Sequence, residues 1–199
     1  MPDPVGAVLA VYDALPDDVE VVILGGLAAN VYRTVPRVTL DADLLLVTDV
    51  KSASGTERTL LAAGFLRPPG RRVYRAGRFE WRRLLWPAPS PEDPTLVDLF
   101  FSGADLHSGV FIRSVASRAI ATSVRGRQVK TATPEDIIVF KALAIASGMR
   151  GPKEITDQDD VRSIVGNPAL HLDTGYVRAM ASTIGVLRVV TRFLRKPRG

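Results

Sequence analysis

The chain of 199 residues contains no cysteine and only two histidines. The absence of cysteine excludes a disulfide framework, a thiolate zinc site and a cysteine nucleophile. The chemistry must therefore come from carboxylates, lysine, arginine, histidine, serine or threonine. His107 and His171 are isolated in the sequence and lack the spacing of metal ligands, so we assign them no role.

Long apolar runs are also lacking. No run approaches the roughly 20 residues that a helix needs to span a bilayer. The first 14 residues contain acids and lack a basic start followed by an apolar core, so they do not resemble a secretory signal. We expect a soluble cytoplasmic protein without a membrane partner.

The chain carries more basic than acidic residues. Lys and Arg total 26 against 21 Asp and Glu, which gives a net charge of +5. Arginine supplies most of the positive charge, and its planar guanidinium binds phosphate through two parallel hydrogen bonds. This composition favours nucleotides or RNA as partners, although an ordinary solvated surface can be equally basic.

Hydrophobic residues make up 46% of the chain, which is ample for a folded core. The periodicity predicts strands at residues 19–24, 40–47 and 95–101, and two hairpins at 71–86 and 120–131. It predicts helices at residues 5–15, 27–32, 54–63, 133–147, 154–165 and 174–194. Strands concentrate before residue 131 and helices after it. We therefore predict an α+β fold (α/β in the broad sense), with a catalytic domain at 1–132 and a helical C-terminal subdomain at 133–199.

Residues 24–46 carry the most informative pattern, LGGLAANVYRTVPRVTLDADLLL. Gly25 and Gly26 allow a tight turn before a helix, whose free N–H groups suit a phosphate. Asp41 and Asp43 are two positions apart on a strand, so both side chains leave the same face. Neighbouring carboxylates repel each other unless they share a cation, and Mg²⁺ prefers oxygen ligands. Taken separately, the glycines are also consistent with a simple turn and the aspartates with the solvent face of an edge strand.

The combined pattern resembles the signature of the polymerase-beta-like nucleotidyltransferases, particularly the small bacterial ones related to AbiE-type toxins. The resemblance implies a nucleotidyltransferase-fold mixed sheet with flanking helices. It implies that Gly25 and Gly26 hold the triphosphate, and that Asp41 and Asp43 hold Mg²⁺ or Mn²⁺. It also implies that a third carboxylate on a later strand, matched by Asp98, completes the catalytic and metal site.

The resemblance extends to about residue 165 and adds weaker candidates. Lys141 matches a lysine that contacts the nucleotide, or it is an ordinary solvated lysine of an amphipathic helix. Arg37 and Thr39 precede the aspartate pair and are candidates for nucleotide binding, with a purely structural role as the alternative. Asp157 and Asp160 compete for the family's late carboxylate. Asn30 and Arg33, on the helix after the glycines, are minor candidates.

A stretch at residues 67–83 contains seven arginines, with Tyr74, Phe79 and Trp81 between them. Aromatic rings and arginines together suit the stacking and phosphate contacts of an RNA acceptor. The alternative is a charged face of a hairpin that binds nothing.

These features predict a magnesium-dependent transferase, EC 2.7.7 in type, that moves a nucleoside monophosphate from ATP or another nucleoside triphosphate to a hydroxyl. The acceptor is open among RNA or tRNA, a protein and a small molecule such as an aminoglycoside, with RNA preferred. The resemblance implies the toxin of a toxin–antitoxin system, with an antitoxin protein as partner. The rival hypothesis is a catalytically inactive module that keeps the fold for binding or regulation.

Overall fold

The computed structural model describes residues 1–49, 52–70, 73–76, 79–87, 90–102, 106–148 and 151–195. Within these residues one sheet of seven strands has the order β3-β4-β5-β2-β1-β7-β6. The strands are β1 (Val21–Ile23), β2 (Asp41–Asp49), β3 (Val73–Ala76), β4 (Phe79–Trp86), β5 (Thr95–Ser102), β6 (Ile120–Val124) and β7 (Arg127–Thr131).

The sheet is mixed. Strand β2 runs parallel to β5 and antiparallel to β1, while β1 runs parallel to β7. The remaining pairs, β3–β4, β4–β5 and β6–β7, are antiparallel. Both expected hairpins are present, and the turn expected near Ala76 and Gly77 falls partly outside the described residues. The predicted α+β mixed sheet is confirmed.

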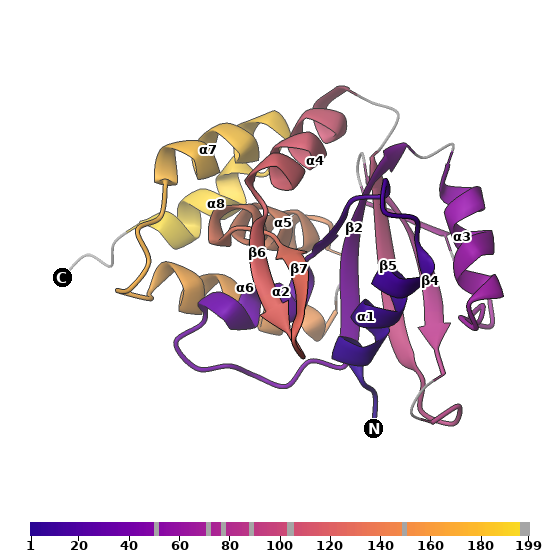
Figure 1. Ribbon diagram of the computed structural model, residues 1–199. Helices are drawn as coiled ribbons and strands as arrows, with labels where there is room; N and C mark the ends of the chain where they lie inside the picture. Colours follow the sequence, from indigo (N-terminus) through magenta and orange to yellow (C-terminus); the bar gives the residue numbers. More distant parts are fainter. Residues whose placement is uncertain are drawn as a thin grey trace.

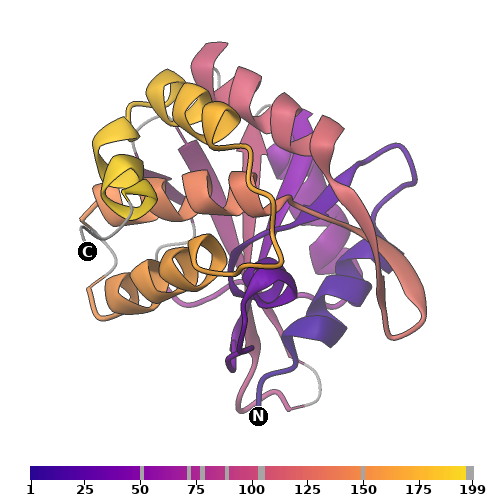
Figure 2. The same ribbon diagram turned by 90° about the vertical axis from the view of Figure 1, so that its left-hand side faces the viewer.

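Eight helices surround the sheet in the described part of the chain. They are α1 (Pro4–Ala14), α2 (Gly25–Tyr32), α3 (Ala53–Ala62), α4 (Leu106–Arg118), α5 (Pro134–Ala146), α6 (Lys153–Val165), α7 (Thr174–Thr183) and α8 (Leu187–Leu194). Helices α5 to α8 gather on one side of the sheet, and α3 lies beyond β4 on the other (Figure 1). Figure 2 shows the β6–β7 hairpin extending from the edge of the molecule. No helix of the described segments is long and apolar enough to cross a membrane.

Local signals explain some of the helix ends. Helix α5 begins after Thr133, whose hydroxyl accepts from the backbone N–H of Asp136, with proline in the first turn as expected. Helix α3 is followed by Gly64, whose φ of +97° places it in the left-handed region that glycine tolerates.

Three expectations about helices were wrong. The single helix expected at 174–194 is two helices, because Gly185 has a φ of +81° and interrupts the helical conformation between α7 and α8. Helix α4 was not predicted, although Phe111, Ile112 and Val115 are buried at helical spacing. Gly25 and Gly26 form the first turn of α2 and not a loop before it.

One hydrophobic core joins the sheet to the C-terminal helices. Leu44 of β2, Leu99 of β5, Phe111 of α4, Ile138 of α5 and Val190 of α8 belong to the same buried cluster. The core therefore crosses residue 132, and the division at 132/133 stays a prediction.

Candidate active site

The register between β2 and β5 positions the three candidate carboxylates. In this parallel pair Asp43 lies opposite Asp98, and Asp41 lies opposite Leu96. Because residues two apart share a face, and because paired residues on neighbouring strands do too, Asp41, Asp43 and Asp98 lie on one face of the sheet.

The glycines bring the start of α2 against Asp43. Gly25 has a φ of +60°, and a Cβ atom placed there would lie 1.8 Å from Oδ2 of Asp43. A Cβ atom at Gly26 would lie 2.6 Å from the Thr39 hydroxyl oxygen and 3.1 Å from Nη2 of Arg37. Only glycine fits at positions 25 and 26 without displacing a neighbouring side chain. The first turn of α2 therefore lies directly beside the carboxylate of Asp43. That N-terminal turn bears the backbone N–H groups that favour anions.

Each of two carboxylates contacts a basic side chain. Both oxygens of Asp98 accept from Arg83 of β4, at 2.7 Å from Nε and 2.6 Å from Nη2. Asp41 accepts from Nζ of Lys153, the first residue of α6, at 2.7 Å, and from the Thr39 hydroxyl at 3.1 Å. Sequence reasoning did not pair Lys153 with Asp41 or Arg83 with Asp98, because both contacts depend on which strands and helices become neighbours.

The oxygen ligands that these residues offer can be compared with those that the expected divalent cation prefers. Asp41 and Asp43 provide oxygen donors on one face, as Mg²⁺ prefers. Asp98 fits less well, because both of its oxygens are already engaged by a guanidinium. Among the described residues, no group of three or more His, Asp and Glu side chains is arranged as a metal site. The assignment of Asp41, Asp43 and Asp98 to metal stays a prediction.

The segment before the aspartate pair is anchored to α6. Arg37 donates to both oxygens of Asp160, from Nε at 2.8 Å and from Nη2 at 2.7 Å. The side-chain amide of Asn30 accepts from the backbone N–H of Arg37 at 3.0 Å and donates to its carbonyl oxygen at 2.7 Å. These contacts favour a structural role for Arg37 and give Asn30 one as well.

Lys141 of α5 is buried, so the interpretation as a solvated lysine was wrong. Its Nζ atom lies 2.6 Å from Asp157 and 3.0 Å from Asp160. Arg33 also reaches Asp160, at 2.8 Å. Asp157 and Asp160 therefore belong to one buried network, which links α5 and α6 to the segment that leads to Asp41. A contact of Lys141 with nucleotide stays a prediction.

The charges of this network shift the pKa of Asp160. Burial alone would raise it, but the hydrogen bonds and charges of Arg37 and Lys141 outweigh burial and lower the pKa of Asp160. Asp160 is thus stabilised as an anion that holds three cations together.

The arginine-rich stretch at 67–83 is divided between the two faces of the sheet. Arg83 contacts Asp98, whereas Arg82 and Arg67 both bind the buried carboxylate of Glu57 on α3, at 2.7 and 2.9 Å. Arg71, Arg72 and Arg78 lie outside the described residues, and the side chain of Arg75 is not described.

The aromatic residues of the stretch are not all available for stacking. The ring of Phe79 is buried and packs edge-on against Phe111, with the centroids 5.9 Å apart, so it is not available for stacking on RNA. Trp81 stacks on Tyr74 at 5.4 Å and on Phe100 at 5.5 Å. The rings thus stabilise the fold of the hairpin.

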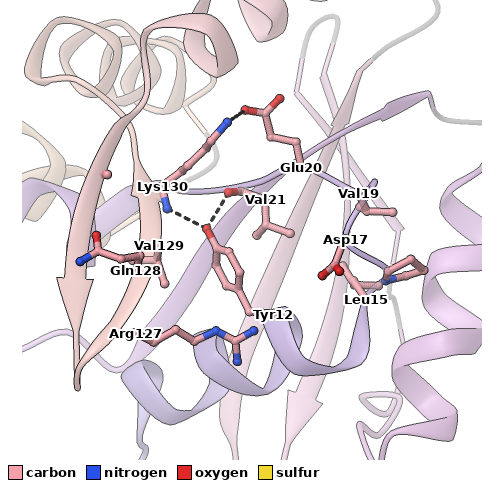
Figure 3. A pocket seen from close by; sticks show the side chains of 12 residues that line it. Tyr12, Leu15, Asp17, Val19, Glu20, Val21, Arg127, Gln128, Val129 and Lys130 are labelled. Carbon is pink, nitrogen blue, oxygen red and sulfur yellow. Dashed lines mark hydrogen bonds and ion pairs between the residues drawn. The ribbon is translucent and has the colours of Figure 1, made fainter.

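A separate cavity of about 410 Å³ lies between α1, the start of β1 and the β6–β7 hairpin (Figure 3). The Tyr12 hydroxyl donates to the carbonyl oxygen of Val21 and accepts from the backbone N–H of Lys130, and the ammonium of Lys130 pairs with Glu20. None of the candidate site residues lines this cavity.

Comparison with known proteins identifies the architecture. No protein-family model and no curated protein matches the sequence. Among solved structures, the chain is similar to an antigenic nucleotidyltransferase-like protein from Paracoccidioides brasiliensis, with 20% identity, 98% of this chain and 95% of that one covered, and a TM-score of 0.50. The chain has the nucleotidyltransferase fold.

A second relative of this fold is ANT(2'')-Ia, solved in complex with adenylyl-2''-tobramycin. Its identity to this chain is 15%, the coverage is 95% of this chain and 98% of that one, and the TM-score is 0.54. A solution structure of the same protein gives 16% identity, coverage of 94% and 90%, and a TM-score of 0.52. At these identities the likeness establishes the nucleotidyltransferase fold, and nothing specific to AbiE-type toxins is found.

Proposed function

We propose that this chain is a nucleotidyltransferase. In the reaction a hydroxyl oxygen of the acceptor attacks the α-phosphorus of a nucleoside triphosphate and the bond to the bridging oxygen breaks. Pyrophosphate leaves, and the hydroxyl proton passes to water. The observation that carries the proposal is the register that sets Asp43 opposite Asp98, with the glycine-started helix α2 against Asp43. This arrangement combines acidic side chains with an anion-binding helix end on the nucleotidyltransferase fold.

The residues have distinct tasks in this proposal. Asp41 and Asp43 would hold Mg²⁺ or Mn²⁺, which supplies a positive charge for the triphosphate and the developing pyrophosphate. The first-turn N–H groups at Gly25 and Gly26 would bind phosphate oxygens, since no side chain keeps the phosphates away. Lys153, which lies beside Asp41, would supply a further positive charge for the phosphates. Lys141 would act through the network that it forms with Asp157 and Asp160.

The acceptor is the less defined half of the reaction. We propose RNA, including tRNA, as the first acceptor to test, since the net charge of +5 favours polyanions. A protein or small-molecule acceptor is also favoured, because Arg67, Arg82 and Arg83 form ion pairs with acidic residues of the same chain. A role as toxin beside an antitoxin protein rests on the motif resemblance alone.

A second candidate function is nucleotide binding without turnover. Two ion pairs favour it, because Arg83 occupies Asp98 and Lys153 occupies Asp41. A module in which basic residues have replaced metal would bind a triphosphate and never cleave it.

One experiment separates the two functions. The protein is incubated with each α-³²P-labelled nucleoside triphosphate and Mg²⁺, in the presence of bulk tRNA, protein extract or aminoglycosides, and each pool is examined for label. Label in one pool, lost in Asp43→Asn but kept in Asp18→Asn, supports transfer; Asp18 is an exposed acid outside the candidate site. Saturable nucleotide binding without label in any pool favours the binding module.

A further inference from the structure

The ion pairs at Asp98 and Asp41 differ in how firmly they are held. Asp98 is engaged through both oxygens by one guanidinium, and its side chain is only 4% exposed. Asp41 accepts from the ammonium of Lys153, whose side chain is 53% exposed on a flexible stem. An exposed lysine contact contributes little and is readily replaced, whereas a buried bidentate pair is costly to break.

Strand pairing builds the Arg83–Asp98 contact into the sheet. Arg83 and Asp98 are direct partners in the antiparallel β4–β5 ladder, so their side chains leave the same face next to each other. The guanidinium carbon of Arg83 also lies 4.9 Å from the centre of the Tyr74 ring, at a distance typical of a cation–π contact. Arg82, one position earlier, points to the opposite face and binds Glu57. The strand register and the Tyr74 ring therefore both hold the side chain of Arg83 beside Asp98.

The positive charge of Arg83 interacts with Asp43 as well as with Asp98. The hydrogen bond to Asp98, with smaller contributions from the charges of Asp98, Tyr74 and Asp43, raises the pKa of Arg83. Arg83 is thus permanently charged and lies within electrostatic reach of Asp43. A divalent cation bound at Asp98 would have to displace a guanidinium from both carboxylate oxygens, whereas the ammonium of Lys153 at Asp41 is exposed.

We propose that the site binds a single divalent cation, at Asp41 and Asp43, and that Arg83 stands at Asp98 in place of a second. The proposal rests on the proposed function and gives the chain a one-cation site where two-metal phosphoryl transfer would use two. Arg83 is then a positioning residue: it fixes the third carboxylate and supplies the fixed positive charge beside it.

The test is a count of bound Mn²⁺ per chain by electron paramagnetic resonance, in the presence of a non-hydrolysable ATP analogue. We expect one Mn²⁺ in the wild-type protein and in Arg82→Gln, the matched control that removes a neighbouring arginine from the opposite face. In Arg83→Gln we expect two, with the spin coupling of ions about 3.5–4 Å apart. Two Mn²⁺ in the wild-type protein, or one in a folded Arg83→Gln variant, would overturn the proposal.

A second variant keeps the test decisive if Arg83→Gln does not fold. The double variant Arg83→Gln/Asp98→Asn replaces a charged pair by a neutral one, leaves the net charge unchanged and removes no single partner from a buried pair. We expect its affinity for Mn²⁺ with the analogue to stay within about threefold of wild type, because Asp98 is not a ligand of the cation in this proposal and a neutral pair can replace a buried ion pair at little cost. A decrease of tenfold or more would refute the assignment. If the wild-type protein bound no Mn²⁺ with the analogue, the proposed function would fail together with this inference, whereas a count of two would leave the function standing.

Discussion

The substitution Asp160→Asn tests whether the buried network holds the two parts of the chain together. Asp160 is fully buried and accepts from Arg33, Arg37 and Lys141 at distances between 2.7 and 3.0 Å. The variant leaves these cations without their shared counter-charge. Lys141 keeps Asp157, whereas Arg37 keeps the uncharged carbonyl oxygen of Val38.

Removing one partner of a buried ion pair costs 3–5 kcal/mol in general. Because Lys141 and Arg33 retain other acceptors, we expect the lower end, about 3 kcal/mol of the free energy of unfolding. The matched control is Asp159→Asn, which removes a carboxylate that is 57% exposed and pairs with Arg33. A contact made by such an exposed carboxylate is worth about 0.5 kcal/mol.

The measurement is urea unfolding followed by tryptophan fluorescence, with the slope of the transition checked for constancy. The network also predicts a pH dependence. Because the pKa of Asp160 is lowered in the folded state, its contribution is present above the unfolded pKa of about 3.9 and is lost as the pH falls through the folded value. A destabilisation in Asp160→Asn no greater than that in Asp159→Asn at pH 7 would refute the reasoning.

Three further predictions concern the glycine turn, a buried acid and the arginines. Gly25→Ala should lower both nucleotide affinity in calorimetry and stability, the latter by about 1–3 kcal/mol, since its Cβ would collide with Asp43 at a positive φ; unchanged affinity would contradict this. Burial raises the pKa of Asp136, so the stability of the wild type relative to Asp136→Asn should be greatest below pH of about 3.9 and fall as the pH rises through the folded pKa; a rise across that window in urea unfolding would disprove it. If the hairpin binds RNA, replacing Arg71, Arg72 and Arg78 by Gln should flatten the salt dependence of tRNA binding by about one counterion for each phosphate that is no longer bound, and an unaltered slope would exclude that surface.

The strands of the candidate site could be predicted because their signals are local. The alternation around Asp41 and Asp43 and the apolar run around Asp98 fix which face each side chain takes, and the fold confirms these strands. Helix α4 also carried a local signal, in the spacing of Phe111, Ile112 and Val115, although we did not predict it.

The ion pairs could not be predicted from the sequence, because they depend on which strands and helices become neighbours. Asp98 meets Arg83 through the β4–β5 register, and Asp41 meets Lys153 across 112 positions of the chain. The same limit applies to Arg37, whose partner Asp160 is 123 positions away. A resemblance in motif identifies such residues without showing which of them neutralise one another.

The anchoring of residues 33–41 along α6 has a consequence for how the protein can be divided. Thr34 lies 3.4 Å from Ser163, Arg37 binds Asp160 and Asp41 binds Lys153, so this segment follows α6 over most of its length. The position of Asp41 and Asp43 therefore depends on contacts with α6, which begins at Lys153. A fragment that ends before α6 would keep every strand together with Asp41, Asp43 and Asp98, yet the segment entering β2 would lose its contacts with Lys153, Asp160 and Ser163. We expect the sheet and the C-terminal helices to unfold in one cooperative transition, so that neither half can be exchanged or expressed as an independent module.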